Sequence, residues 1–539
     1  MSTDEPSPTP GDVRGGALTG RQIARATGVV MLAFVASRLL GLVRNAAIGA
    51  TFGAGPELDA FLAAQRLPET LFVLVAGGAL GSSFIPVFSR FLNRGERTRA
   101  WDLASATINL LVVVSLLATV ISYLLAPQVA ASILVPGAPP DAQTLTADLM
   151  RAMLLTVVIF AVSGLLMGIL NAHQHFLAPA LAPSLYNLGI IGGALFLATP
   201  IGVYGLAWGT VIGAALHFAV QLPALRRVAP RYRPVLSLRT PGVIEVLRLM
   251  GPRVIGLAIV QINFWVNTAL ASAMGEAAIT ALTLSFQVML MPQAIIAQSI
   301  ATAVFPTLSA HAATGRAAEF RAALGGALRS VLYLSIPSTV GLVALNAPII
   351  AVIYERGQWS AGDTAATAWV LVFWGAGLVG HCLVEVLARA FYALADTRTP
   401  VLVGGAAMAL NVAFSLAFIR VVGDPADVTR TPAAGLALAN SLATALEATG
   451  LWLLLRRRLG DFAAEERRVA RSAARVAVAA LAMGALLYAA MRALAGWPDA
   501  VLLAAAMAAG GALFWGITYA LGAEEARAVP GLVLARLRR

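Results

Sequence analysis

The sequence predicts an all-α integral membrane protein of about fourteen transmembrane helices, arranged as two pseudo-symmetric six-helix lobes plus two C-terminal helices. Three observations lead to this prediction: an unusually apolar composition, apolar runs of membrane-spanning length, and an internal repeat. Hydrophobic residues make up 59% of the 539 residues and charged residues only 12%. A soluble fold cannot bury that much apolar surface, because the buried fraction of a chain saturates with its size, whereas lipid can act as its solvent.

The apolar runs are long enough to form helices that cross a bilayer, each of which needs about 20 mostly apolar residues. They fall at 22–52, 59–91, 102–125, 146–171, 177–199, 201–225, 243–274, 278–310, 322–353, 364–392, 399–421, 431–456, 470–493 and 497–522. Only helices and closed barrels satisfy every backbone polar group in lipid, and these runs are too long for the strands of a barrel. We therefore expect helices throughout and no soluble domain.

These spans divide the chain into five parts. Residues 1–21 are rich in Pro, Ser, Thr and Gly without an apolar core, so we interpret them as a disordered cytoplasmic tail and not a signal peptide. The N-terminal lobe occupies 22–228 and the C-terminal lobe 243–458. Two extra helices follow at 466–522, and a basic cytoplasmic tail at 523–539 ends the sequence.

An internal repeat indicates that the two lobes have the same orientation. The segment SRLLGL at 37–42 corresponds to PRVIGL at 252–257, and FIPVFS at 84–89 corresponds to VFPTLS at 304–309. The copies are six spans apart, an even number, so both cross the membrane in the same direction. Parallel repeats of this kind form two lobes with the substrate site between them.

The net charge of +12 indicates the topology of the chain and not a nucleic-acid partner. All 38 basic residues are Arg, and most lie near one side of the predicted membrane, including those in 90–99, 226–239, 316–329 and 456–475. Under the positive-inside rule, this side faces the cytoplasm. We therefore expect a multi-pass protein of a bacterial inner membrane with both termini in the cytoplasm.

Charged side chains in the first two spans are the strongest functional signal, because a charge at the centre of a span costs roughly 2.5–3.5 kcal/mol. They are Arg38, Arg44, Asp59 and Arg66. For Arg38 and Arg44 to face one cavity, their helix must bend, and Gly41 is the obvious place. Guanidinium groups suit bidentate contacts with phosphate oxygens, so these arginines predict an anionic ligand such as phosphate or pyrophosphate.

Structural roles are also open for two of these four residues. Asp59 is equally consistent with a solvated position at a loop end. Arg66 lies seven residues further on, on the same helix face, and could form a salt bridge with Asp59.

The second lobe carries fewer charges and more amides. Arg253, Asn263 and Gln287 are candidates for contact with the substrate, although hydrogen bonds between helices also explain buried amides in a membrane bundle. A weaker pattern is consistent with a small cation. Its oxygen ligands would come from Asn267, Asn411 and Ser415.

No signature of an enzyme is present in the sequence. It has no GxxxxGK[ST] phosphate-binding loop, no HExxH motif and no nucleophile elbow with partners, and its one cysteine, Cys382, excludes a cysteine-cluster metal site. We therefore expect a transporter that needs no cofactor or structural metal. Without an ATP site, transport must use a Na⁺ or H⁺ gradient, the membrane potential or the gradient of the substrate.

Four stretches of the sequence resemble the MurJ (MviN) family, the lipid II flippases of a larger superfamily of MATE-like multidrug, oligosaccharidyl-lipid and polysaccharide exporters. They are SRLLGLVRNAAIGATFGAGPELDAFLAAQRLP at 37–68, GGALGSSFIPVFSRF at 77–91, IYERGQWSAGDT at 353–364 and VEVLARAFYALADTRTP at 384–400. The resemblance extends over roughly residues 22–460 and implies fourteen helices in two lobes. It also implies flipping of lipid II, an undecaprenyl-pyrophosphate-linked disaccharide-pentapeptide, to the outer leaflet by alternating access.

The resemblance assigns roles to the charged residues of the first two spans. The family's cavity-lining arginines fall on Arg38 and Arg44, its acidic residue after the FGAG turn on Asp59, and its basic residue before Leu-Pro on Arg66. The arginines would grip the pyrophosphate, and Asp59 would pair with an Arg in the empty state. The cavity is less charged than in some members, whose charged residues are replaced by Phe72, Val73, Gly77, Phe286, Gln287 and Leu290.

Three other functions are compatible with the same composition. They are a flippase for another undecaprenyl-linked glycan, a cation-coupled drug exporter, and a non-transporting scaffold that binds cell-wall synthesis proteins. The DTRTP and ERGQWS stretches favour the cell-wall branch, and a drug exporter for cations would need an acidic cavity. A scaffold has no reason to bear the insertion cost of buried arginines.

Overall fold

The computed structural model describes residues 20–75, 78–460, 462–494 and 496–527. Within these ranges the chain forms helices and no strands, as predicted for an all-α membrane protein. Twelve helical segments there are long and apolar enough to cross a membrane, and the count of fourteen stays a prediction. Most of the two predicted tails lies outside the described residues.

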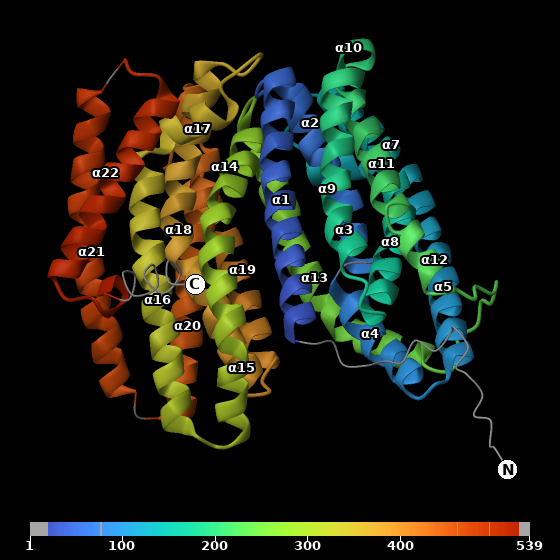
Figure 1. The fold of residues 1–539 in the computed structure, drawn as a ribbon. Helices are drawn as coiled ribbons and strands as arrows, with labels where there is room; N and C mark the ends of the chain where they lie inside the picture. Colours follow the sequence, from blue (N-terminus) through green and yellow to red (C-terminus); the bar gives the residue numbers. More distant parts are fainter. Residues whose placement is uncertain (1–19, 76–77, 461, 495, 528–539) are drawn as a thin grey trace.

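The first half of the chain forms one helical group, which we call the N-terminal lobe (Figure 1). Its helices are α1 (Gly20–Phe52), α2 (Pro56–Ala64), α3 (Arg66–Val75), α4 (Gly78–Asn93), α5 (Arg97–Leu124), α6 (Ala126–Val129), η1 (Ala130–Leu134), α7 (Pro140–Met153), α8 (Leu155–Ala172), α9 (Leu177–Gly192), η2 (Gly193–Leu197), α10 (Ala198–Ile201), α11 (Tyr204–Ala219) and α12 (Leu222–Arg227). The predicted spans 22–52 and 59–91 correspond in position to α1 and to the series α2–α4, which are helical but are not among the twelve segments above.

The second half forms the C-terminal lobe, followed by a C-terminal helix pair (Figure 1). The lobe contains α13 (Val243–Ala271), α14 (Ala278–Gln293), η3 (Ala294–Gln298), α15 (Ser299–Ala313), α16 (Ala317–Ala344), α17 (Asn346–Tyr354), α18 (Ala361–Ala393), α19 (Arg398–Phe418), η4 (Val428–Arg430) and α20 (Ala433–Leu459). The pair is α21 (Ala463–Ala493) and α22 (Asp499–Ala520), and α21 packs against α16. Helix α13 contacts α3 and α4 as well as α19, so it lies at the junction of the two lobes.

The helical bundle has two ends, which we name by their position in Figure 1. The upper end is where α1 finishes at Phe52, and the lower end is where α4 finishes at Asn93. Several long spans are interrupted between these ends. For example, the π-helical turn η3 starts two residues after Pro292, because proline has no N–H for the helical ladder.

Glycines allow α9 and α11 to approach each other closely within the N-terminal lobe. A Cβ atom on Gly189 would lie 2.3 Å from the Cα atom of Gly213, and one on Gly193 would lie 2.7 Å from the Cα atom of Gly209. Small residues at helix contacts are the usual means of packing in membranes, where the hydrophobic effect does not drive helices together. The α9–α11 contact therefore depends on the missing side chains.

We predict that Gly189→Ala destabilises the protein, because the added methyl group must push α9 away from α11. Overpacking of this kind costs about 1–3 kcal/mol. The matched control is Gly192→Ala on the same helix, where an added Cβ meets no atom within 4 Å. Thermal melting in detergent should give a lower midpoint for Gly189→Ala alone, and equal midpoints for the two variants would contradict this account of the packing.

Candidate functional site

Arg44 lies in the last third of α1, which continues as one helix through Gly41. Its Nε and Nη2 atoms donate to Asn45 Oδ1 at 3.0 and 2.9 Å, and its Nη1 atom donates to Asn187 Oδ1 of α9 at 3.1 Å. Both partners are neutral amides, and Arg44 forms no ion pair with any described carboxylate. Its positive charge is therefore held in place without being neutralised.

Asn45 connects this arginine to the other lobe. Its side chain is buried, and its Nδ2 atom donates a hydrogen bond to Oε1 of Gln287 on α14. A movement of the lobes would therefore break a contact directly beside Arg44. Arg44 and Gln287 were predicted from the sequence and Asn45 was not, although a polar residue directly beside Arg44 in an apolar helix is a usable signal.

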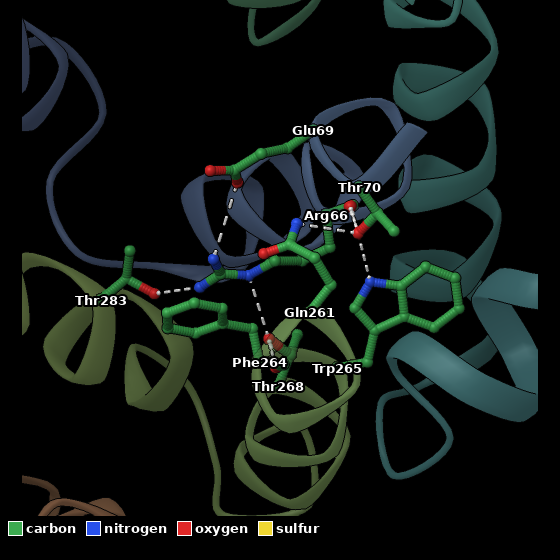
Figure 2. Close-up of polar contacts among 8 residues, drawn as sticks. All are labelled: Arg66, Glu69, Thr70, Gln261, Phe264, Trp265, Thr268 and Thr283. Carbon is green, nitrogen blue, oxygen red and sulfur yellow. Dashed lines mark hydrogen bonds and ion pairs between the residues drawn. The ribbon is translucent and has the colours of Figure 1, made fainter. Parts of the chain in front are cut away.

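Arg66, the first residue of α3, also bridges the two lobes (Figure 2). Its Nε and Nη2 atoms donate to the hydroxyl groups of Thr268 and Thr283, both at 3.2 Å, and its guanidinium group lies 5.3 Å from the ring centroid of Phe264. Its nearest carboxylate is that of Glu69, at 3.9 Å. Since the side chain of Glu69 is 55% exposed, this ion pair offsets little of the charge of Arg66.

Thr70, one turn further along α3, extends the same interface (Figure 2). Its hydroxyl oxygen accepts hydrogen bonds from Trp265 Nε1 at 2.8 Å and from Gln261 Nε2 at 3.1 Å. Both donors belong to α13, so α3 and α13 are joined through Arg66 and Thr70 together.

Asp59 forms no ion pair with any described arginine, contrary to the expectation for the empty state. Its Oδ1 atom accepts the backbone N–H of Thr280 at 2.7 Å and the hydroxyl group of the same residue at 2.5 Å. Thr280 lies in the first turn of α14, where backbone N–H groups have no helical acceptor and the helix dipole favours a negative charge. The carboxylate of α2 thus caps a helix of the opposite lobe, and Arg66 uses other partners.

A second contact closes the upper end between α1 and the loop before α18. The backbone N–H of Gln358 donates to the carbonyl oxygen of Ala50 at 2.8 Å. Gly357 has a φ of +61°, and a Cβ atom there would lie 2.2 Å from the same oxygen, so the loop requires glycine. A Cβ atom on Gly49 would lie 2.9 Å from the ring of Trp359.

Fewer contacts of this kind are seen at the lower end. Arg90 of α4 and Glu245 of α13 form a partly exposed ion pair, and the hydrogen-bonded guanidinium group holds the pKa of Glu245 below its usual value. Arg253 Nη1 donates to Ser83 Oγ at 3.3 Å. Exposed ion pairs contribute little to stability, so most of the packing at this end comes from the buried apolar residues Val243, Val246 and Met250 of α13, which share a core cluster with α4.

The remaining predicted arginine, Arg38, is exposed on α1. It lies six residues before Arg44, so the two side chains leave the helix about 120° apart. Arg44 points towards α9, as its hydrogen bond to Asn187 shows. The structure therefore does not bring these two arginines together on one face of α1.

The buried amides of the C-terminal lobe meet in one cluster between α13 and α19. Asn263 Oδ1 accepts from Asn267 Nδ2 at 2.8 Å and from Asn411 Nδ2 at 3.1 Å. The Oδ1 atoms of Asn267 and Asn411 are buried without a hydrogen-bond partner, as is Oγ of Ser415 one turn along α19. Buried polar atoms are normally satisfied, so three free oxygens in one region need an explanation.

A cavity of about 1160 Å³ adjoins this cluster. Arg253, Asn263 and Asn411 line it among the predicted residues, whereas Arg38, Arg44, Arg66 and Asp59 do not. Its wall also contains ionisable residues that were not among the predicted site residues, including His381 of α18 and Glu447 of α20. Glu447 is a charge inside a predicted span, and the insertion cost of such a residue could have identified it.

The chain is similar to known proteins over most of its length. A family model described as "Lipid II flippase MurJ" matches residues 48–506. The sequence is 31% identical over 430 residues to the lipid II flippase MurJ of Burkholderia cenocepacia, which covers 78% of this chain and 81% of that protein. It is 29% identical over 471 residues to the probable lipid II flippase MurJ of Haemophilus influenzae, and this match covers 84% of this chain and 89% of that protein.

Solved structures share the fold. A structure titled "Lipid II flippase MurJ, inward closed conformation" matches with a TM-score of 0.76 at 23% identity, and the match covers 91% of this chain and 98% of that one. An inward-facing multidrug resistance MATE family transporter matches with a TM-score of 0.63 at 16% identity, covering 79% and 95%. At these identities the likeness concerns the fold alone.

We predict that Asp59→Ala exposes the start of α14 to solvent exchange. A hydrogen bond to a charged group contributes about 1.5–3 kcal/mol, so amide exchange around Thr280 should become about tenfold faster or more. Hydrogen–deuterium exchange measured by mass spectrometry would follow this peptide. Glu57→Ala is the control, because Glu57 is exposed in the same first turn of α2, and an unchanged rate in Asp59→Ala would refute the capping role.

Proposed function

The chain belongs to the lipid II flippase MurJ family, and we propose that it flips lipid II from the cytoplasmic to the outer leaflet by alternating access. Members of this family are transporters, and the chain is a multi-pass membrane protein. Its cargo would be an undecaprenyl-pyrophosphate lipid with a disaccharide-pentapeptide head group. The head group would pass between the two lobes while the lipid tail stays in the bilayer.

The observation that carries this proposal is the state of Arg44. A permanently charged side chain lies on α1, in the predicted span 22–52, and among the described residues it is hydrogen-bonded only to the amides of Asn45 and Asn187. In a site with little water, such a charge favours an anionic ligand, and the planar guanidinium group suits the oxygens of a pyrophosphate. Arg66, with its weak ion pair, and the exposed Arg38 would supplement this contact.

The arrangement of contacts supports alternating access with the lower end towards the cytoplasm. The arginine-rich segments 90–99, 226–239 and 456–475 connect helices at the lower end, as the positive-inside rule requires of cytoplasmic loops. Both termini would then be cytoplasmic. The backbone and capping contacts at the upper end would hold the outer side shut until the cargo is bound.

We further propose that the amide cluster of the C-terminal lobe binds a small monovalent cation such as Na⁺ that couples to transport. Asn267, Asn411 and Ser415 offer oxygen atoms without partners, and broken or adjacent helices supply such sites in other transporters. The cluster contains no carboxylate, and the described residues contain no group of three or more metal-ligating His, Cys, Asp or Glu side chains. Neutral oxygens suit a weakly held coupling ion.

We predict that Arg44→Ala lowers the rate of lipid II translocation at least roughly tenfold, because the loss of a charge-assisted contact with the pyrophosphate costs about 1.4 kcal/mol or more. The assay is the flipping of labelled lipid II in proteoliposomes. Arg231→Ala removes an exposed arginine at the lower end and should leave the rate unchanged. Full activity of Arg44→Ala would contradict the proposed role of the arginine.

The same assay separates lipid II from other cargo. An undecaprenyl-pyrophosphate-linked glycan without the peptide should be translocated poorly by the wild type. Equal rates for the two lipids would instead indicate a general flippase for lipid-linked glycans.

We predict that Na⁺ raises the melting temperature of the wild type relative to K⁺, because a bound ion stabilises the folded state by mass action. Ser415→Ala should reduce this difference, since it removes one of the free oxygens. Ser338→Ala is the control, because the hydroxyl group of Ser338 bonds to its own helix at Leu334. A wild type with equal melting temperatures in both salts would rule out a Na⁺ site in this cluster.

A further inference from the structure

Glu447 is the unexplained charge of the C-terminal lobe. It lies within α20, a candidate membrane span, and its side chain lines the 1160 Å³ cavity. It forms no ion pair and no hydrogen bond with any described residue. A carboxylate in a span is costly, and such residues normally pair with one another or serve a ligand.

The other carboxylate of the cavity wall is satisfied. Glu385 of α18 forms an ion pair with Arg389, one turn away on the same helix, with 2.9 Å between Oε1 and Nη2. Arg253 and Arg398 also line the cavity, but neither forms an ion pair with Glu447. Glu447 is therefore the acidic group of the wall that has no ion-pair partner among the described residues, and it shares the cavity with these two arginines.

The wall also makes room for this carboxylate. Gly404 of α19 faces it, and a Cβ atom there would lie 3.2 Å from Oε1 of Glu447. Asn440 and Thr444 precede Glu447 on α20 by seven and three residues and line the same cavity, so one face of the helix presents all three polar groups. On the adjacent helix α18, Nε2 of His381 is buried without a hydrogen-bond partner.

We propose that this cavity binds an organic ammonium group, with Glu447 as its counter-ion. The rings of Phe264, Phe286 and Tyr392 line the same space and suit a cation with an apolar body. A bare metal ion fits poorly, because it needs several oxygen ligands close together. The cavity is instead large enough for a drug-sized organic ligand.

The ammonium group has two conceivable sources. One is an amine on the peptide of the lipid-linked cargo, which rests on the proposed function. The other is a free small organic cation. Either ammonium group would pair with Glu447 in the same way. The experiment therefore needs one arm for the peptide amine of the cargo and one for a free organic cation.

The first arm measures translocation in proteoliposomes of two lipid II probes that differ only in a peptide amine, which is free in one and acetylated in the other. We expect the wild type to favour the free amine about tenfold at low concentration, as one desolvated ion pair would give. Glu447→Gln should lose this preference and Glu447→Asp should keep part of it. Glu319→Gln, at an exposed position of α16, is the control and should behave as the wild type.

The second arm measures binding of benzyltrimethylammonium to the detergent-purified protein by calorimetry, without any lipid cargo. Binding that weakens about tenfold in Glu447→Gln, together with no discrimination between the two lipids, assigns the cavity to free cations. Discrimination between the lipids that depends on Glu447 assigns it to the cargo.

The proposal is overturned if neither arm changes in Glu447→Gln while its melting temperature equals that of the wild type. A wild type that moves neither lipid would contradict the proposed function instead. In that case the calorimetric arm still decides whether Glu447 binds a cation.

Discussion

The structure depends on one constraint, which is that the hydrocarbon core of a membrane offers polar groups no water. Each polar side chain in a span must find a partner in the protein or in a ligand. In this chain many of the partners lie in the opposite lobe, as Asn45 with Gln287 and Asp59 with Thr280 illustrate. The contacts that satisfy buried polar groups are therefore also the contacts that a transport cycle must break and remake.

The same constraint suggests a ligand for the buried polar and charged groups that lack some of their hydrogen-bond or ion-pair partners. Arg44 and Arg66 are held by amides and hydroxyls, so their positions are fixed while most of their charge stays available. The C-terminal lobe has free oxygens at Asn411 and Ser415 and, at Glu447, a carboxyl group without an ion-pair partner among the described residues. A cargo that carries both a pyrophosphate and a peptide amine would find guanidinium groups for the one and the carboxyl group of Glu447 for the other.

The sequence contained enough information to predict the fold class, because the length of apolar runs follows directly from the thickness of a bilayer. The cost of burying charge also selected Arg44 and Arg66, whose guanidinium groups bond to polar partners on other helices, and their contact with cargo stays a prediction. The partner of Asp59 could not be predicted, because Thr280 lies 221 residues away and no local pattern connects the two. The exposed position of Arg38, and the absence of a break in α1 at Gly41, depend on how α1 packs against α9, which a single sequence does not contain.

The central claim is that the upper end of the bundle opens when cargo is bound. Distances between spin labels test it directly, with Cys382 replaced by alanine and cysteines placed at the exposed positions Asp141 and Ala426 of the upper end. A second pair at Asn93 and Thr314 reports on the lower end. We expect lipid II to lengthen the upper distance in part of the population and to shorten the lower one. Unchanged distances in protein that translocates lipid II would contradict alternating access.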